Sequence, residues 1–180
     1  MRRTVELGFL LALSLILSYV ESLIPLSFGI PGIKLGLPNL IVLLLLYETL
    51  DGEQEKGKTL SLSRGAREAL LVNGLRILLS GFLFSNLYAI LYALAGAVLS
   101  FIAMCLGRRV RCFSMVGVSI LGGVFHNIGQ ILVAMLVVET FAVVYYVPFL
   151  IVAGTVTGAL LGFVAMQLVP YLQRWNREEK

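Results

Sequence analysis

Polar side chains recur at helical spacing inside the apolar segment 66–84. Asn73 stands three residues before Arg76 and Ser80 stands four residues after it, so a helix puts all three on one face. Arg76 follows Arg67 by nine residues, which corresponds to about 14 Å along a helix. Ionisable side chains at such depth in an apolar span are costly and usually functional. We therefore predict that Arg76 and Asn73 bind an anionic or strongly polar ligand.

A second polar stripe follows in the segment 113–138. It contains the only histidine of the chain, His126, with Asn127 beside it and Gln130 one helical turn further on. Two polar stripes at matching depth would meet at lowest cost across a shared cavity, and we predict that they do. The alternative is that these side chains only hydrogen-bond the helices together, as polar residues in membrane bundles often do.

A guanidinium inside a membrane needs a counter-charge. The chain has ten acidic residues, and Asp51 is its one aspartate. Glu21 and Glu139 fall near the ends of apolar segments and would reach Arg76 only if a helix tilts. A bound anionic ligand could serve instead.

The segment 25–39 contains three prolines and three glycines, which predicts a shaped, largely non-helical loop. It either folds over the mouth of the bundle, with Lys34 above the cavity and Asn39 starting the next helix, or forms a re-entrant turn with Lys34 at the lipid headgroups. Four tyrosines could line the same mouth or form an interfacial belt: Tyr88, Tyr92, Tyr145 and Tyr146.

Residues 52–59 match the letters of a phosphate-binding loop, G-x-x-x-x-G-K-T. That loop works only between a buried strand and a helix, whereas here an apolar helix is expected before it. Glu53 and Glu55 would also repel phosphate. We interpret the match as spurious, so any energy from ATP must come from a partner.

The composition requires a membrane. Of the 180 residues, 59% are hydrophobic and 13% are charged, against about a quarter charged in soluble domains. A spanning helix needs about 20 apolar residues. We predict an all-α integral membrane protein, a bundle of six transmembrane helices in a single domain (residues 1–172) followed by a charged cytoplasmic tail (173–180). The predicted spans lie near residues 4–26, 37–50, 66–84, 86–106, 113–138 and 142–172.

The basic residues predict the orientation, since Lys and Arg in short loops concentrate on the cytoplasmic side. Twelve of the 14 basic residues fall on one side when both termini are cytoplasmic. An even number of spans is needed for this, and the plasma membrane is the expected location. We attribute the net charge of +4 to this topology, so no nucleic-acid partner is predicted. The run after Met1 lacks a cleavage site, which indicates an uncleaved first helix.

Small residues at four-residue spacing mark two helices. Gly154, Gly158 and Gly162 do so in the last span, and Gly8 and Ala12 do so in the first. Such ridges let helix backbones approach, either within the bundle or against another membrane subunit. Cys105 and Cys112 are expected to be free thiols, and no metal or other cofactor is predicted.

Two segments resemble a known family. Residues 32–39 (GIKLGLPN) and the run from Gly117 through His126-Asn127-Ile128-Gly129-Gln130 resemble the heptaprenyl diphosphate synthase component I family, also called the Gx transporter family. That family is similar to the S components of energy-coupling factor (ECF) transporters, which are six-helix substrate-binding proteins. The resemblance covers residues 4–170.

The resemblance implies roles for several residues. Lys34, Gly36 and Asn39 would belong to the loop over the pocket, and the side chains of His126, Asn127 and Gln130 would face it. Gly8 and Ala12 would replace the alanines through which S components dock to a transmembrane coupling subunit, which works with an ATPase pair. The substrate would be a small vitamin-like, isoprenoid or quinone-related molecule.

Two other functions remain open. The chain could be a membrane component of a heptaprenyl diphosphate synthase, with the synthase as its partner. Aspartate-rich clusters hold magnesium in such enzymes, and a chain with one aspartate cannot make them, so we predict that it is not catalytic alone. A purely structural membrane subunit would leave the buried Arg76 unexplained.

Overall fold

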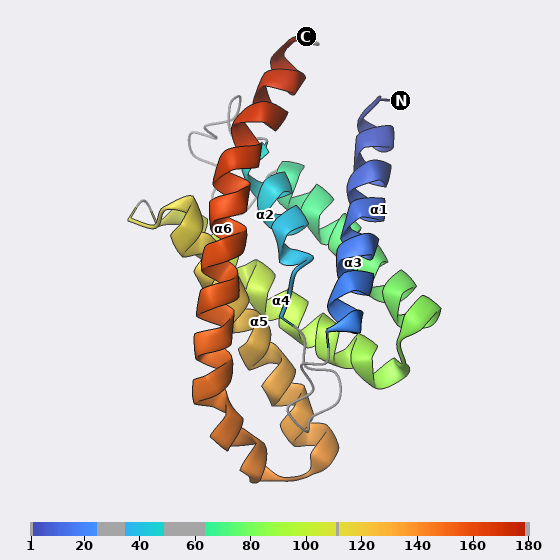
Figure 1. Cartoon of the computed structure of the whole chain (residues 1–180), viewed down its shortest axis with the longest axis vertical. Coiled ribbons are helices and arrows are strands. Elements are labelled where there is room, and N and C mark those ends of the chain that lie inside the picture. Colours follow the sequence, from blue (N-terminus) through green and yellow to red (C-terminus); the bar gives the residue numbers. More distant parts are fainter. Residues whose placement is uncertain (1, 25–34, 49–63, 111, 179–180) are drawn as a thin grey trace.

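The computed structural model describes residues 2–24, 35–48, 64–110 and 112–178. These residues form six α-helices and one 3-10 helix, with no strand among them, so the all-α class is confirmed (Figure 1). The elements are α1 (Arg2–Leu23), α2 (Asn39–Glu48), α3 (Arg64–Phe84), α4 (Leu87–Arg109), α5 (Met115–Val138), η2 (Phe141–Tyr146) and α6 (Val147–Glu178).

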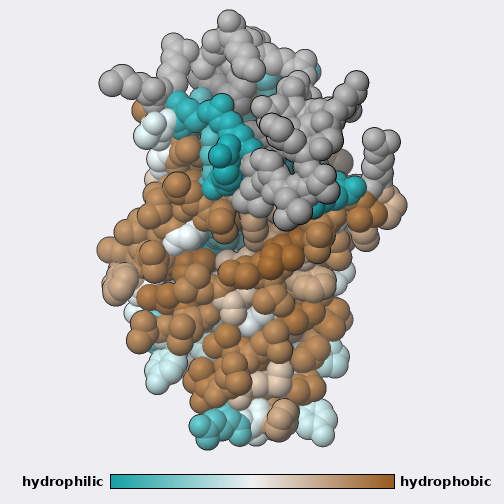
Figure 2. Space-filling model, turned by 180° about the vertical axis from the view of Figure 1, so that it is seen from behind, coloured by the Kyte–Doolittle hydropathy of each residue, from teal (hydrophilic) through white to brown (hydrophobic). Residues whose placement is uncertain are grey.

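Four stretches are long and apolar enough to cross a membrane. Three are the helices α1, α4 and α5, and the fourth is the continuous stretch of η2 and α6. Figure 2 shows the corresponding apolar surface, a broad band with hydrophilic residues toward both ends. Helix α3 is also long, with 21 residues, but it carries Arg67, Glu68 and Arg76. The chain is therefore a membrane protein in which one long helix carries charge into the bundle.

Helix α2 occupies residues 39–48 of the predicted span 37–50, of which 49 and 50 lie outside the described residues. Its ten residues extend about 15 Å, half of the roughly 30 Å hydrocarbon core. Residues 41–46 are 0–3% exposed, so α2 is enclosed by the other helices. In Figure 1 it lies between α1 and α6. Non-helical backbone at membrane depth is tolerated where protein surrounds it, and this explains how residues 35–38 can precede α2 inside the bundle.

Glycines bring the backbones of α4, α5 and α6 into contact. A Cβ atom added to Gly123 of α5 would stand 2.3 Å from the carbonyl oxygen of Gly154 in α6, and one on Gly129 would stand 2.5 Å from that of Ala95 in α4. Gly158 and Gly162 likewise face α5. The ridge of the last helix thus packs inside the bundle, as one of the two interpretations of the sequence held.

The face of α1 around Gly8 is open instead. Both Gly8 and Ala12 are exposed, and a Cβ atom on Gly8 would have nothing within 4 Å. This leaves the predicted docking face accessible.

Helix α1 begins and α6 ends at the same end of the bundle (Figure 1), and charged side chains gather near the start of α1. Arg3 Nη1 lies 2.7 Å from Glu48 Oε1 and 2.8 Å from Glu6 Oε2, and its Nη2 pairs with Glu68. Arg3 therefore ties α1 to both α2 and α3. The Arg108 guanidinium, 5.6 Å from the ring centroid of Tyr47, brings the end of α4 to the same region.

We expect Arg3→Ala to lower the free energy of unfolding by about 2 kcal/mol, because it leaves the nearly buried Glu48 carboxylate without this partner. Arg64→Ala is the matched comparison. Arg64 also pairs with Glu68, at 3.0 Å, but its side chain is 62% exposed, so it should cost less than about 1 kcal/mol. Reversible unfolding in mixed micelles, followed by circular dichroism, measures both. Equal losses would refute a special role for Arg3.

Candidate functional site

Arg76 is held in the bundle interior by two neighbouring side chains. Its Nε and Nη2 atoms both donate to Oδ1 of Asn73, at 3.1 and 2.7 Å, and its Nη1 donates to Oγ of Ser18 in α1, at 3.2 Å. Ser80, the third member of the predicted stripe, donates to the backbone carbonyl of Ile77 instead. Arg76 is 4% exposed, so this charge is fully inside the protein.

Glu21 is the acidic residue whose charge acts on Arg76. It lies one turn after Ser18 on α1 and is 4% exposed. The sequence left Glu21 and Glu139 open for this role. Glu139 lies exposed at the end of α5, so the structure selects Glu21.

The Glu21 carboxylate also caps the start of α2. It accepts hydrogen bonds from the backbone N–H groups of Gly36 and Leu37, the latter at 3.3 Å. The next N–H groups, from Asn39 onward, already donate to the carbonyls of residues 36–38. The unsatisfied amides of this helix start therefore lie one turn before Asn39, and an acidic side chain from α1 satisfies them. Gly36 has φ +82°, a conformation that favours glycine.

The His126 ring lies between two glycines. A Cβ atom on Gly36 would stand 3.2 Å from Cδ2 of the ring, and one on Gly96 of α4 would stand 2.9 Å from Nδ1 and Cε1. The same position on Gly36 is 3.1 Å from Nδ2 of Asn39. Gly36 thus brings Glu21, Asn39 and His126 together, although they come from three separate elements.

We call this connected set the polar belt. Its side chains are 0–7% exposed, so it is closed to solvent. Its members are Ser18, Glu21, Gly36, Asn39, Asn73, Arg76 and His126.

Asn127 and Gln130 are buried on α5 as well, with exposures of 2% and 0%. Asn127 Nδ2 donates to the carbonyl of Leu150 in α6 at 2.8 Å, so this side chain lies between α5 and α6 and not beside the His126 ring. Lys34 and the phosphate-loop letters at 52–59 lie outside the described residues, as does most of the predicted loop 25–39.

The buried polar atoms that lack a hydrogen-bond partner in the described parts of the chain include Asn39 Nδ2, Asn127 Oδ1 and Ser100 Oγ. Such atoms are uncommon in proteins and each needs an explanation. Ser100 was not among the residues predicted from the sequence. Its signal was the one serine in the largely apolar segment 86–106.

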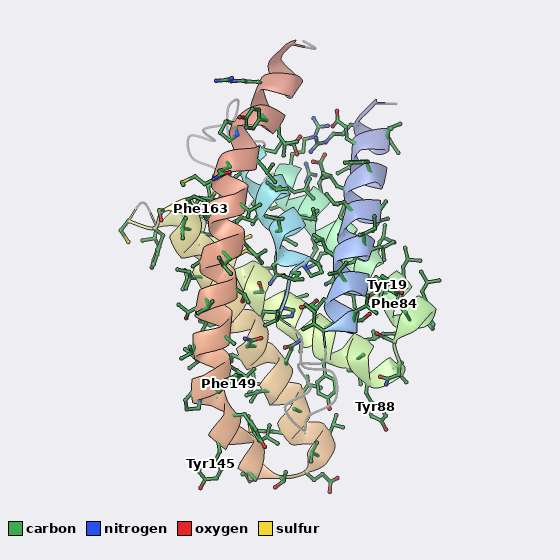
Figure 3. The ribbon with its side chains drawn as sticks, in the orientation of Figure 1. Tyr19, Phe84, Tyr88, Tyr145, Phe149 and Phe163 are labelled. Atoms are coloured by element: carbon green, nitrogen blue, oxygen red, sulfur yellow. The ribbon has the colours of Figure 1, made fainter. Side chains whose placement is uncertain are left out.

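Most of the four tyrosines lie away from the belt. Tyr88 is 59% and Tyr145 is 88% exposed, and Figure 3 shows both at the bundle surface, far from the end that carries the termini. Tyr146 is 41% exposed, whereas Tyr92 is buried against Ile131. Exposed tyrosines at one end of an apolar band fit a ring of aromatic residues at the membrane–water interface.

These features define the class: a helical membrane protein with a buried, charge-paired polar site around a short interior helix. The chain belongs to the heptaprenyl diphosphate synthase component I family, whose sequence model matches residues 10–55 and 59–168. The resemblance seen in the sequence is thereby confirmed. Comparisons with curated proteins and with solved structures gave no match.

Proposed function

We propose that this protein is the substrate-binding membrane subunit of an ECF-type uptake transporter. Its substrate would be a small vitamin-like, isoprenoid or quinone-related molecule. It would lie in the plasma membrane with both termini in the cytoplasm, and coupling and ATPase subunits on other chains would power it.

The observation that carries this proposal is the polar belt. Burying a guanidinium, a carboxylate and an imidazole in a membrane bundle costs stability. Such groups are therefore usually kept because function requires them. Here they meet where a short interior helix starts, and broken helices with their ends at mid-membrane are a recurring way to build substrate sites. Asn39 Nδ2, which has no partner among the described residues, adds a donor that a ligand can use.

The predicted docking residues support the same function. Gly8 and Ala12 lie on the open face of α1, the helix that also carries Ser18 and Glu21 to the belt. A coupling subunit bound there would therefore contact the helix that reaches the substrate site.

The family description favours a second candidate, a non-catalytic membrane component of a heptaprenyl diphosphate synthase. A prenyl diphosphate combines an apolar chain with a polar head, and the belt inside an apolar bundle would suit such a molecule. The chain would then present or receive lipid for a partner enzyme.

Native mass spectrometry of the gently purified protein tests these functions. We expect a retained small molecule, and an ATPase pair in the complex purified from membranes. A prenyl synthase in place of the ATPase pair would support the second candidate. If the protein retained no small molecule and no partner, both functions would be contradicted.

Asn39→Ala should reduce retention of that molecule at least about tenfold, which corresponds to one lost hydrogen bond of about 1.4 kcal/mol. Asn86→Ala is the matched control. Asn86 also stands at a helix start, where it caps the exposed first turn of α4 away from the polar belt. Equal retention in the two variants would refute a ligand at Asn39.

A further inference from the structure

The Glu21 carboxylate lies in a site made of donors. The backbone N–H groups of Gly36 and Leu37 both donate to its Oε1 atom, and the positive charge of Arg76 acts on it. Successive backbone N–H groups around a residue with positive φ form a concave anion-binding nest, and Gly36 has φ +82°. Glu21, Gly36 and Arg76 are buried and Leu37 is partly buried, so the site works at low dielectric, where charge interactions are strong.

The site has more donors than the one carboxylate uses. Arg76 has five N–H groups, and its three hydrogen bonds to Asn73 and Ser18 leave two of them over. Asn39 Nδ2 is a further donor, without a partner in the described residues and 3.1 Å from the Cβ position of Gly36. Asn39 is 7% exposed, so water does not readily replace the missing partner.

We propose that the Gly36 and Leu37 amides, Arg76 and Asn39 Nδ2 form a site for the anionic head of the substrate, and that Glu21 occupies it as an internal substitute. The ligand class is a carboxylate or phosphate on an apolar body. This inference rests on the proposed function and specifies the substrate class of the same site.

The proposal makes ligand and Glu21 competitors. Two anions beside one guanidinium repel each other, so the head group enters when the carboxylate withdraws or takes up a proton. The apparent affinity is then the intrinsic affinity multiplied by the fraction of molecules whose site is open. Glu21 thereby keeps the buried Arg76 balanced while the site holds no substrate, and α1 gains a direct influence on binding.

Binding of simple amphiphiles to the purified protein tests this. The probes are decanoate and decyl phosphate, with decanol as the uncharged control, and native mass spectrometry counts the bound molecules over a concentration series. We expect Glu21→Gln to bind one or both anions at least about tenfold more tightly than the unchanged protein, with decanol unaffected. The preferred anion distinguishes a carboxylate from a phosphate head.

Two variants complete the test. Glu139→Gln removes an exposed acidic charge outside the site and should leave all affinities unchanged. The double variant Glu21→Gln with Arg76→Gln should not show this tighter binding of anions, because the cation that attracts the probe is gone. Unchanged anion affinity in folded Glu21→Gln would overturn the proposal.

If Glu21→Gln does not fold, Glu21→Ala replaces it, because it removes the carboxylate from the site altogether. It should also bind the anions more tightly, and unchanged affinity would again overturn the proposal. The result of this anion-binding test can be distinguished from the result of the test of the transport function. A natural molecule and an ATPase pair retained without any anion effect would refute only this inference, whereas a clear anion effect with neither would refute only the transport function.

Discussion

Arg76→Ala is expected to lower the free energy of unfolding by about 3–5 kcal/mol, the largest effect that we expect from any single side chain. The change removes the positive charge that acts on the buried Glu21 carboxylate, and a buried charge that loses compensation is strongly destabilising. It also removes the donors to Asn73 and Ser18, both of which are buried. Reversible unfolding in mixed micelles gives the free energy, with circular dichroism as the signal.

Two comparisons show whether the loss comes from the charge pair. Arg67→Ala removes an exposed arginine from the same helix and should change stability by less than about 0.5 kcal/mol. Replacing Arg76 by leucine and Glu21 by glutamine together should recover much of the loss, because both charges are removed while the glutamine oxygen can still accept from the Gly36 and Leu37 amides. A double variant as unstable as Arg76→Ala would mean that the two charges do not depend on each other.

The helices were largely predictable because the hydrophobic segments are long. The expected spans 86–106 and 113–138 correspond to α4 and α5, and both helices begin and end within three residues of those bounds. The segment 37–50 also contains a helix, α2, but its ten residues are too few to cross the hydrocarbon core alone. An apolar run indicates burial, but it does not distinguish a helix crossing lipid from a shorter one enclosed by protein, which is the case for α2.

The stripe around Arg76 was predictable from helical periodicity, because Asn73 is one turn away on the same helix. The partners from other helices were not. Ser18 and Glu21 reach Arg76 because of how α1 is positioned along α3, and sequence spacing within one helix contains no such information. The role of Gly36 depends on a positive φ and on two contacts from distant elements.

The separation of His126 from Asn127 has the same origin. Neighbouring residues on a helix point about 100° apart, so whether both face one pocket depends on which helices surround α5. With α4 on one side and α6 on the other, the His126 ring meets Gly96 and the Asn127 amide meets Leu150. Only the first of these positions joins the polar belt.

Gly123→Ala is expected to lower the free energy of unfolding by about 3 kcal/mol, the upper part of the range for overpacked sites. The added Cβ atom would stand 2.3 Å from the carbonyl oxygen of Gly154, a backbone atom that moves only if α5 and α6 separate. That separation would also weaken the hydrogen bond from Asn127 to Leu150. Thermal unfolding in detergent measures the change.

Gly8→Ala and Gly74→Ala are the matched controls, because an added Cβ atom has nothing within 4 Å at either helical position. Alanine favours helix over glycine by about 1 kcal/mol, so these variants should be as stable as the unchanged protein or slightly more stable. If Gly123→Ala behaved like them, close backbone contact would not be what holds α5 against α6.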